Sequence, residues 1–133
     1  MIRKCTLNDL DFCFEVAEKF GVLAGHVIDR DRLQETLLML MDHGVMIRSD
    51  KGIIGGMIFP FYMSGEIACQ EFFWYSEGGD GVDLLKEFER ICKEEGVSRV
   101  IMSTLCNDYQ EKIDSLLLNN GYRHFEHSLV RNL

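Results

Sequence analysis

Three closely spaced glycines, Gly78, Gly79 and Gly81, lie where a protein could bind an anion. The apolar, aromatic run at 67–75 is typical of a strand, and the residues from Val82 onward have the spacing of an amphipathic helix. The first N–H groups of a helix have no acceptor within it, and the helix dipole adds partial positive charge there. Because glycine lacks a Cβ, an anion can approach these donors closely. The loop is therefore a candidate pyrophosphate site, and the alternative is a tight turn with no ligand.

Carboxylates near this loop are candidates for acid–base chemistry. Glu71 lies within the run 67–75, and Glu66 comes directly before it. A carboxylate in such a place could accept a proton from an amine, directly or through water. The alternative interpretation is that Glu71 is an ordinary exposed strand residue.

Histidines and cysteines indicate no further chemistry. His124 and His127 are an odd number of positions apart, so on a strand they would face opposite sides and could not act together. The four histidines and five cysteines show no metal-ligand spacing, so no metal is predicted.

The composition is that of an ordinary globular protein. Its 133 residues suit one domain over 1–133, with 47% hydrophobic and 27% charged residues. The net charge of -8 argues against a nucleic-acid partner, because phosphate contacts need clustered Lys and Arg. No apolar run approaches the ~20 residues that span a bilayer, and the first residues lack the apolar core of a secretion signal. Scattered cysteines without a CxxC pair indicate reduced thiols and a cytoplasmic location.

A strand and two helices are expected before the central strands. The strand is expected at 2–6, and the first helix is expected to end at Phe20–Gly21. The stretch 21–28 is apolar, which is unusual for a loop, so it should line a pocket or pack beneath the next helix. That second helix is expected to start at Asp29 or Asp31 and to end at His43–Gly44.

The middle of the chain predicts an antiparallel meander. Strands are expected at 45–49, 53–62 and 67–75, joined by turns rich in glycine and polar residues. Gly55 and Gly56 inside the middle strand suggest a bulge or a close approach of two backbones.

The rest of the chain predicts a crossover and a final pair of strands. A helix from Val82 to Gly96 and a strand at 97–103 form a strand–helix–strand unit with a parallel pair. A helix capped by Asp108 and strands at 122–125 and 128–132 complete the chain. The order βααβββαβαββ predicts an α+β domain with a mixed, mainly antiparallel sheet flanked by four helices.

Two stretches carry a resemblance to a known family. The stretch EFFWYSEGGDGVDLLKEFERICKEEGVSRVIM, followed later by LLLNNGYRHFEHSLVRNL, resembles the coenzyme-binding and closing segments of the GNAT superfamily of N-acetyltransferases. The opening IRKCTLNDLDFCFEVAEKF is similar to the first strand and helix of that family. The resemblance covers nearly the whole chain and implies a GNAT-like fold.

The resemblance also implies acetyl-CoA as the acyl donor and an amine as the acceptor. The acetyl group would pass by direct attack to an amine of a small molecule or of a protein. The pyrophosphate would bind backbone N–H groups of Gly79, Asp80, Gly81 and Val82, and the pantetheine arm would pair with the backbone of Phe73, Trp74 and Tyr75. Asn107 would lie near the pantetheine or cap a helix, Glu71 is the candidate base, and Tyr109 is the candidate acid.

Several positions depart from the family pattern. Ser76 stands where relatives have Gln or Arg, and Leu117 stands where many have a Tyr acid. Glu77 and Asp80 place negative charge beside the expected phosphates. The alternative function is therefore a catalytically weak or inactive GNAT-fold module that binds a CoA or a protein partner. A homodimer is compatible with either interpretation.

Overall fold

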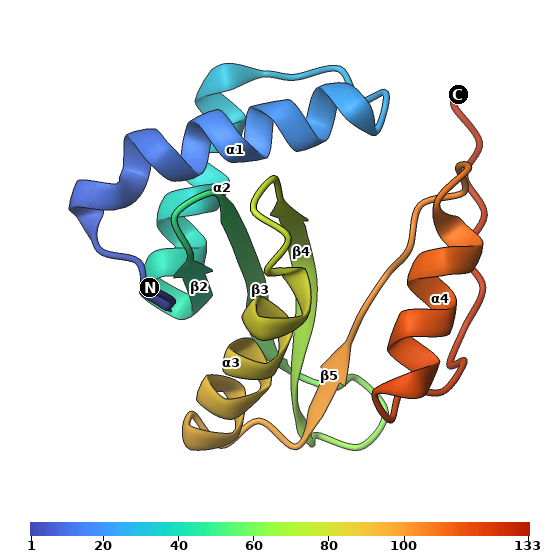
Figure 1. Ribbon diagram of the computed structural model, residues 1–133. Helices are drawn as coiled ribbons and strands as arrows, with labels where there is room; N and C mark the ends of the chain where they lie inside the picture. The colour runs from blue at the N-terminus through green and yellow to red at the C-terminus, as the bar shows by residue number, and fades with distance from the viewer. The chain divides into compact units, whose positions relative to one another are not determined.

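The computed structural model describes residues 1–133 and divides into two compact units, Met1–Ser103 and Thr104–Leu133. The first unit holds the sheet and three of the four α-helices (Figure 1). The second holds the last helix. The single domain expected over 1–133 stays a prediction. None of the helices is both long and apolar enough to span a bilayer.

The sheet of the first unit has five strands in the order in which they occur along the chain. Neighbours are antiparallel except for the last pair, which is parallel, so the predicted meander and crossover are confirmed. The Ser49 N–H donates to the Gly52 carbonyl at 2.9 Å and closes the first hairpin. The strands are β1 (Arg3–Lys4), β2 (Gly44–Arg48), β3 (Gly52–Pro60), β4 (Ile67–Ser76) and β5 (Arg99–Ile101).

Helices cover both faces of this sheet, and alternation along the strands decides which residue faces which helix. Met46 and Ile53 pack in a cluster with buried residues of α1 (Leu10–Leu23) and α2 (Arg30–His43). Their neighbours Ile47 and Ile54 are fully buried and face the other way. That second face is covered by α3 (Gly81–Glu94), whose buried residues include Leu84, Leu85, Phe88, Ile91 and Cys92 (Figure 1).

Helix ends follow capping chemistry at some positions and tertiary contacts at others. The Asp29 carboxylate accepts the Arg32 N–H at 3.0 Å, so Asp29 caps the start of α2. Of the two predicted starting residues, Asp29 and Asp31, the first is therefore confirmed. The predicted end of α1 at Phe20–Gly21 is wrong, because the helix continues to Leu23. Gly21 serves packing instead: a Cβ there would lie 3.1 Å from Ile28 Cδ1, so its absence lets Ile28 pack against the helix.

A bulge interrupts the pairing of β3 with β4. Gly55 pairs with Phe73 and Gly56 pairs with Glu71, so Phe72 is an extra residue on β4. A Cβ on Gly56 would lie 2.5 Å from the Gln70 carbonyl oxygen, so only glycine allows this approach. The predicted bulge is therefore confirmed, with its extra residue on the partner strand.

The second unit contains α4 (Gln110–Asn119) and no strand. Asn107 Oδ1 accepts the Tyr109 N–H at 3.0 Å in the turn before α4, whereas the helix itself has no side-chain cap, so the cap predicted at Asp108 is wrong. The strands predicted at 122–125 and 128–132 are wrong, because 122–133 holds neither helix nor strand. Alternation in sequence forms a strand only where a neighbouring strand supplies hydrogen bonds, and these residues pair with none.

Candidate active site

Two parallel strands separate at the centre of the sheet. β4 pairs with β5 only where Ala68, Cys69 and Gln70 face Arg99, Val100 and Ile101. β5 then ends, whereas β4 continues to Ser76 with its other edge bonded to β3. From Glu71 onward, one edge of β4 therefore has no strand partner in the first unit, and its backbone groups are available to an extended ligand.

The glycine loop between β4 and α3 presents unused donors. The N–H groups of Gly79, Gly81 and Val82 donate to no acceptor in the protein, and the start of α3 has no side-chain cap. Gly79 has φ +73°, and a Cβ on it would meet nothing within 4 Å. These donors lie in a turn that is open at Gly79, at the positive end of a helix dipole, and such a position favours phosphate groups.

The side chain of Trp74 fixes this loop to β4. Its Nε1–H donates to the Gly81 carbonyl at 2.9 Å, and a Cβ on Gly81 would lie 3.7 Å from the same nitrogen. The indole therefore holds the first turn of α3 through a carbonyl and uses none of its N–H groups.

The two acidic residues of the loop are both engaged within the protein. The Ser76 hydroxyl donates to the Asp80 carboxylate, and this bond is the main cause of a pKa of Asp80 below its ordinary value. Glu77 Oε1 accepts from Lys19 Nζ of α1 at 3.2 Å, so its side chain is directed to α1. Two negative charges are expected beside the phosphates. Because Glu77 is paired with Lys19, the charge that remains at the loop is mainly that of Asp80.

Glu71 lies where β4 and β5 separate. It is 8% exposed, so the alternative of an ordinary exposed strand residue is wrong. Glu71 Oε1 accepts the Ser103 N–H at 3.2 Å, and burial raises the pKa of this carboxyl to about 7 although that bond lowers it. A carboxyl that titrates near neutrality is suited to proton transfer at physiological pH.

Sequence reasoning missed Gln70, whose side chain links β4 to the end of β5 at the point where the two strands begin to separate. Its Nε2 donates to the Ile101 carbonyl at 3.3 Å and to Ser103 Oγ at 3.2 Å. The only signal in the sequence is an amide within an apolar strand. These bonds fix the backbone that donates to Glu71.

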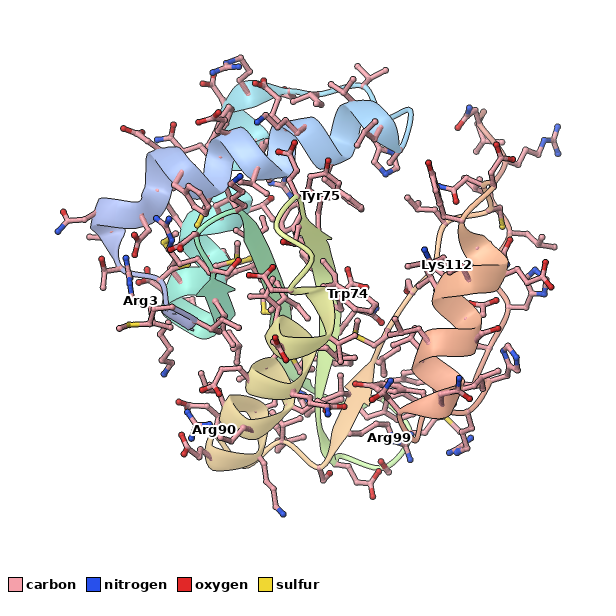
Figure 2. All side chains as sticks on the ribbon, in the orientation of Figure 1. Arg3, Trp74, Tyr75, Arg90, Arg99 and Lys112 are labelled. Carbon is pink, nitrogen blue, oxygen red and sulfur yellow. The ribbon has the colours of Figure 1, made fainter.

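The three aromatic residues at the end of β4 alternate between the faces of the sheet. Phe73 and Tyr75 both contact the Phe20 ring of α1, with ring centroids 6.4 and 6.2 Å away, whereas Trp74 reaches the start of α3 (Figure 2). Their side chains thus serve packing and loop anchoring, and the backbone groups of 73–75 that point away from β3 remain for the predicted contact with pantetheine. Tyr75 also borders a pocket.

That pocket lies between the end of α1, the loop that follows it, and the end of β4. Its volume is about 670 Å³. The apolar stretch 21–28 supplies several of its residues, so the prediction that this loop lines a pocket is confirmed. Sequence reasoning missed the charged members Glu18 and Lys19, because both belong to α1. The lining residues are Glu18, Lys19, Val22, Leu23, His26, Ile28, Tyr75 and Glu77.

The two remaining candidates lie in the second unit. Tyr109 is 69% exposed and directly precedes α4, and Asn107 accepts the Tyr109 N–H in the turn described above. The roles of Tyr109 as an acid and of Asn107 as a coenzyme ligand stay predictions.

Comparison with known proteins identifies the fold. No protein-family model matches the chain, and no curated protein matches its sequence. A probable acetyltransferase matches with TM-score 0.77 and 16% identity, over 100% of this chain and 96% of that one. Glucosamine-6-phosphate N-acetyltransferase from Arabidopsis thaliana matches with TM-score 0.71 and 13% identity, over 99% and 97%. A predicted acetyltransferase from Clostridium acetobutylicum, solved with acetyl-CoA, matches with TM-score 0.76 and 10% identity, over 99% and 95%. The chain therefore has the fold of these acetyltransferases, as its resemblance to the GNAT superfamily predicts.

Proposed function

We propose that the protein is an acetyl-CoA-dependent N-acetyltransferase that acts on an amine of a small molecule or a protein. The observation that carries the proposal is the set of unused N–H groups at the start of α3, next to the unpaired edge of β4. The N–H groups suit a pyrophosphate, and the strand edge suits an extended arm. The two lie next to each other, as the pyrophosphate and the pantetheine arm do in coenzyme A. The shared fold supports the proposal.

Each part of the site has a role in this proposal. The N–H groups of Gly79, Asp80, Gly81 and Val82 bind the pyrophosphate, and the open turn at Gly79 leaves room for it. The backbone of 73–75 binds the pantetheine arm. Acetyl-CoA supplies the activated acetyl thioester.

Glu71 takes the proton from the acceptor amine in the proposed reaction. The neutral amine then forms the new C–N bond as the C–S bond breaks, the nitrogen loses its extra proton to give the amide, and the thiolate that leaves takes up a proton. Tyr109 is the candidate donor of that proton. Because the pKa of Glu71 is about 7, the rate should rise with pH through neutrality as this base becomes ionised.

A second candidate function is a module of the same fold with weak or no activity, which binds a CoA or a protein partner. One feature of the glycine loop favours this second candidate function. Ser76, which stands at the usual Gln or Arg position, is bonded to Asp80 and brings no positive charge to the phosphate site.

Coenzyme binding is the first test. Trp74 is the only tryptophan, and its indole is bonded to the loop, so its fluorescence should report the binding of acetyl-CoA. Gly81→Glu should weaken that binding at least about 10-fold, because the new carboxylate repels phosphate and obstructs the donors. Isothermal titration would confirm the affinity.

Gly79→Glu needs a matched control, since a residue with φ +73° is strained by any side chain. Gly65 has the same φ and equally open surroundings in the turn before β4, so Gly65→Glu measures the strain alone. Both variants should lose similar stability, and only Gly79→Glu should lose coenzyme affinity. Equal affinities would contradict the placement of the site. Release of free thiol over an amine panel would then separate an enzyme from a binding module.

A further inference from the structure

Two of the five free cysteines lie in contact near the start of the chain. Cys5 Sγ and Cys13 Sγ are 3.4 Å apart, which suits a hydrogen bond in which either sulfur can donate. Because the S–S bond of a disulfide is about 2.05 Å long, the two sulfurs need to approach by only about 1.4 Å to form one. No sequence motif marks this pair, since seven residues separate the two cysteines.

The backbone holds both thiols in this contact. Cys5 directly follows the edge strand β1, and its N–H donates to the Met46 carbonyl of β2 at 2.9 Å. Cys13 belongs to α1 and packs in the core cluster that α1 and α2 share. Because each thiol is fixed by its own element, little conformational entropy is lost when a bond forms between them.

The two thiols differ in their access to solvent. Cys13 has no exposed surface, whereas Cys5 is only partly buried. A small reagent therefore reaches Cys5 first. Cys13 is already in place to attack an adduct that forms on the Cys5 sulfur.

The surroundings of the pair favour one thiolate. The hydrogen bond from Cys5 is the main cause of a lowered pKa of Cys13, and Arg48 and Arg3 act in the same direction against burial and Asp9. The same bond raises the pKa of Cys5, so the pair keeps one proton. Since either sulfur can donate, this proton can pass to Cys13 and leave the reactive charge on the accessible sulfur of Cys5.

We infer that Cys5 and Cys13 form a redox-active dithiol, which a small hydroperoxide oxidises to an intramolecular disulfide. Cys5 is the attacking thiol, and Cys13 is the resolving thiol. The inference does not depend on the proposed acetyl transfer, because neither thiol belongs to the glycine loop or to β4.

The oxidation takes place in two steps. The Cys5 thiolate attacks hydrogen peroxide, so an S–O bond forms as the O–O bond breaks, and hydroxide leaves with a sulfenic acid on Cys5. The Cys13 thiolate then attacks the Cys5 sulfur, so the S–S bond forms as the S–O bond breaks, and a second hydroxide leaves. The protons of the two thiols convert both hydroxides to water. The two sulfurs together lose two electrons, and the peroxide gains them.

A second pair of cysteines is a matched control within the same protein. Cys69 of β4 interacts with Cys92 of α3, and this interaction is the main cause of a raised pKa of Cys69. Their exposed fractions are 0% and 1%, so peroxide in solution reaches neither sulfur of the folded protein. This pair should therefore stay reduced while Cys5 and Cys13 are oxidised.

Peptide mapping of the folded, peroxide-treated protein tests the inference. The remaining thiols are alkylated with iodoacetamide in urea, and tryptic peptides are analysed by mass spectrometry. Cys5 and Cys13 share the peptide 5–19, which should lose two hydrogens and carry no alkyl group until dithiothreitol restores both thiols. Cys69 and Cys92 should be oxidised at least about 10-fold more slowly. Equal rates for the two pairs, or a peptide 5–19 that stays fully alkylated, would overturn the inference.

Three variants test the order of the steps. In Cys13→Ala, peroxide should leave a sulfenic acid on Cys5 that dimedone traps, because no thiol resolves it. In Cys5→Ala, the buried Cys13 should stay reduced, and equal trapping in the two variants would contradict the assigned roles. Cys106→Ser removes the exposed cysteine, and loss of the disulfide in this variant would show that the pair is oxidised only by exchange with Cys106 and would overturn the inference.

Thermal unfolding gives a readout of the contact itself. The disulfide closes a loop of nine residues and so restricts the unfolded chain. The unfolding midpoint should rise by at least about 5 °C on oxidation, and dithiothreitol should reverse this rise, which it does not do for oxidised methionine. Peroxide should produce no rise in Cys13→Ala. A midpoint of the natural protein that stays constant or falls would refute the proximity of the two thiols.

Discussion

Replacement of the buried Glu71 by glutamine should make the protein more stable at neutral and alkaline pH. Burial raises the pKa of this carboxyl from 4.5 to about 7, so the folded state disfavours its ionised form. Below pH 4.5 the carboxyl is neutral in both states and adds no cost. Between the two pKa values the folded state holds a proton that the unfolded state has lost, so stability falls as pH rises.

The size of the effect follows from the two pKa values. Each unit between them is worth 1.36 kcal/mol, so ionised Glu71 costs about 3 kcal/mol above pH 7. Glutamine carries no charge and keeps an oxygen that can accept the Ser103 N–H. The stability of Glu71→Gln relative to the natural protein should therefore increase by about 2 kcal/mol between pH 5 and pH 8.

Urea unfolding at several pH values measures this difference directly. Other titrating groups occur in both proteins and cancel when the two curves are subtracted. Glu66→Gln, at an exposed carboxylate just before β4, controls for the exchange of glutamate for glutamine. A stability gap between Glu71→Gln and the natural protein that stays constant from pH 5 to pH 8 would refute the assignment of a buried, late-titrating carboxyl.

Three further substitutions test the fold around the site. Asp9→Asn should lower the free energy of unfolding by about 3 kcal/mol at pH 7, because Asp9 is buried and accepts from both Arg3 and Arg48; urea unfolding measures the loss. Those partners lower the pKa of Asp9, so its stabilisation is present above the ordinary pKa of an aspartate and is lost as pH falls, and the variant's loss should shrink in acid. Phe88→Ala should cost about 4 kcal/mol in the same measurement, because it removes a fully buried ring where α3 packs on the sheet. Trp74→Phe should keep the fold but weaken acetyl-CoA affinity by about 5-fold in calorimetry, because the bond to the Gly81 carbonyl contributes about 1 kcal/mol to holding the loop; an unchanged affinity would show that the loop needs no anchor.

Local patterns predicted the elements that build the site. The glycines before Val82 ended β4 and opened α3, because positive φ and free N–H groups are properties of a few adjacent residues. Gly55 and Gly56 indicated the bulge, since a missing Cβ is visible in the sequence. The same local reasoning failed at 122–133, where strand formation depends on a partner that the pattern does not contain.

The sequence by itself thus determined the order of the elements as far as α4 and the glycine loop, both of which depend on neighbours a few residues apart. Only the tertiary structure decided that Glu71 is buried against Ser103, 32 positions away, and that Glu77 pairs with Lys19, 58 positions away. The physical reason is that a pKa and an ion pair depend on the groups that surround a side chain in space. Those groups come from strands and helices distant in sequence, so the charges around the candidate site could be known only from the folded chain.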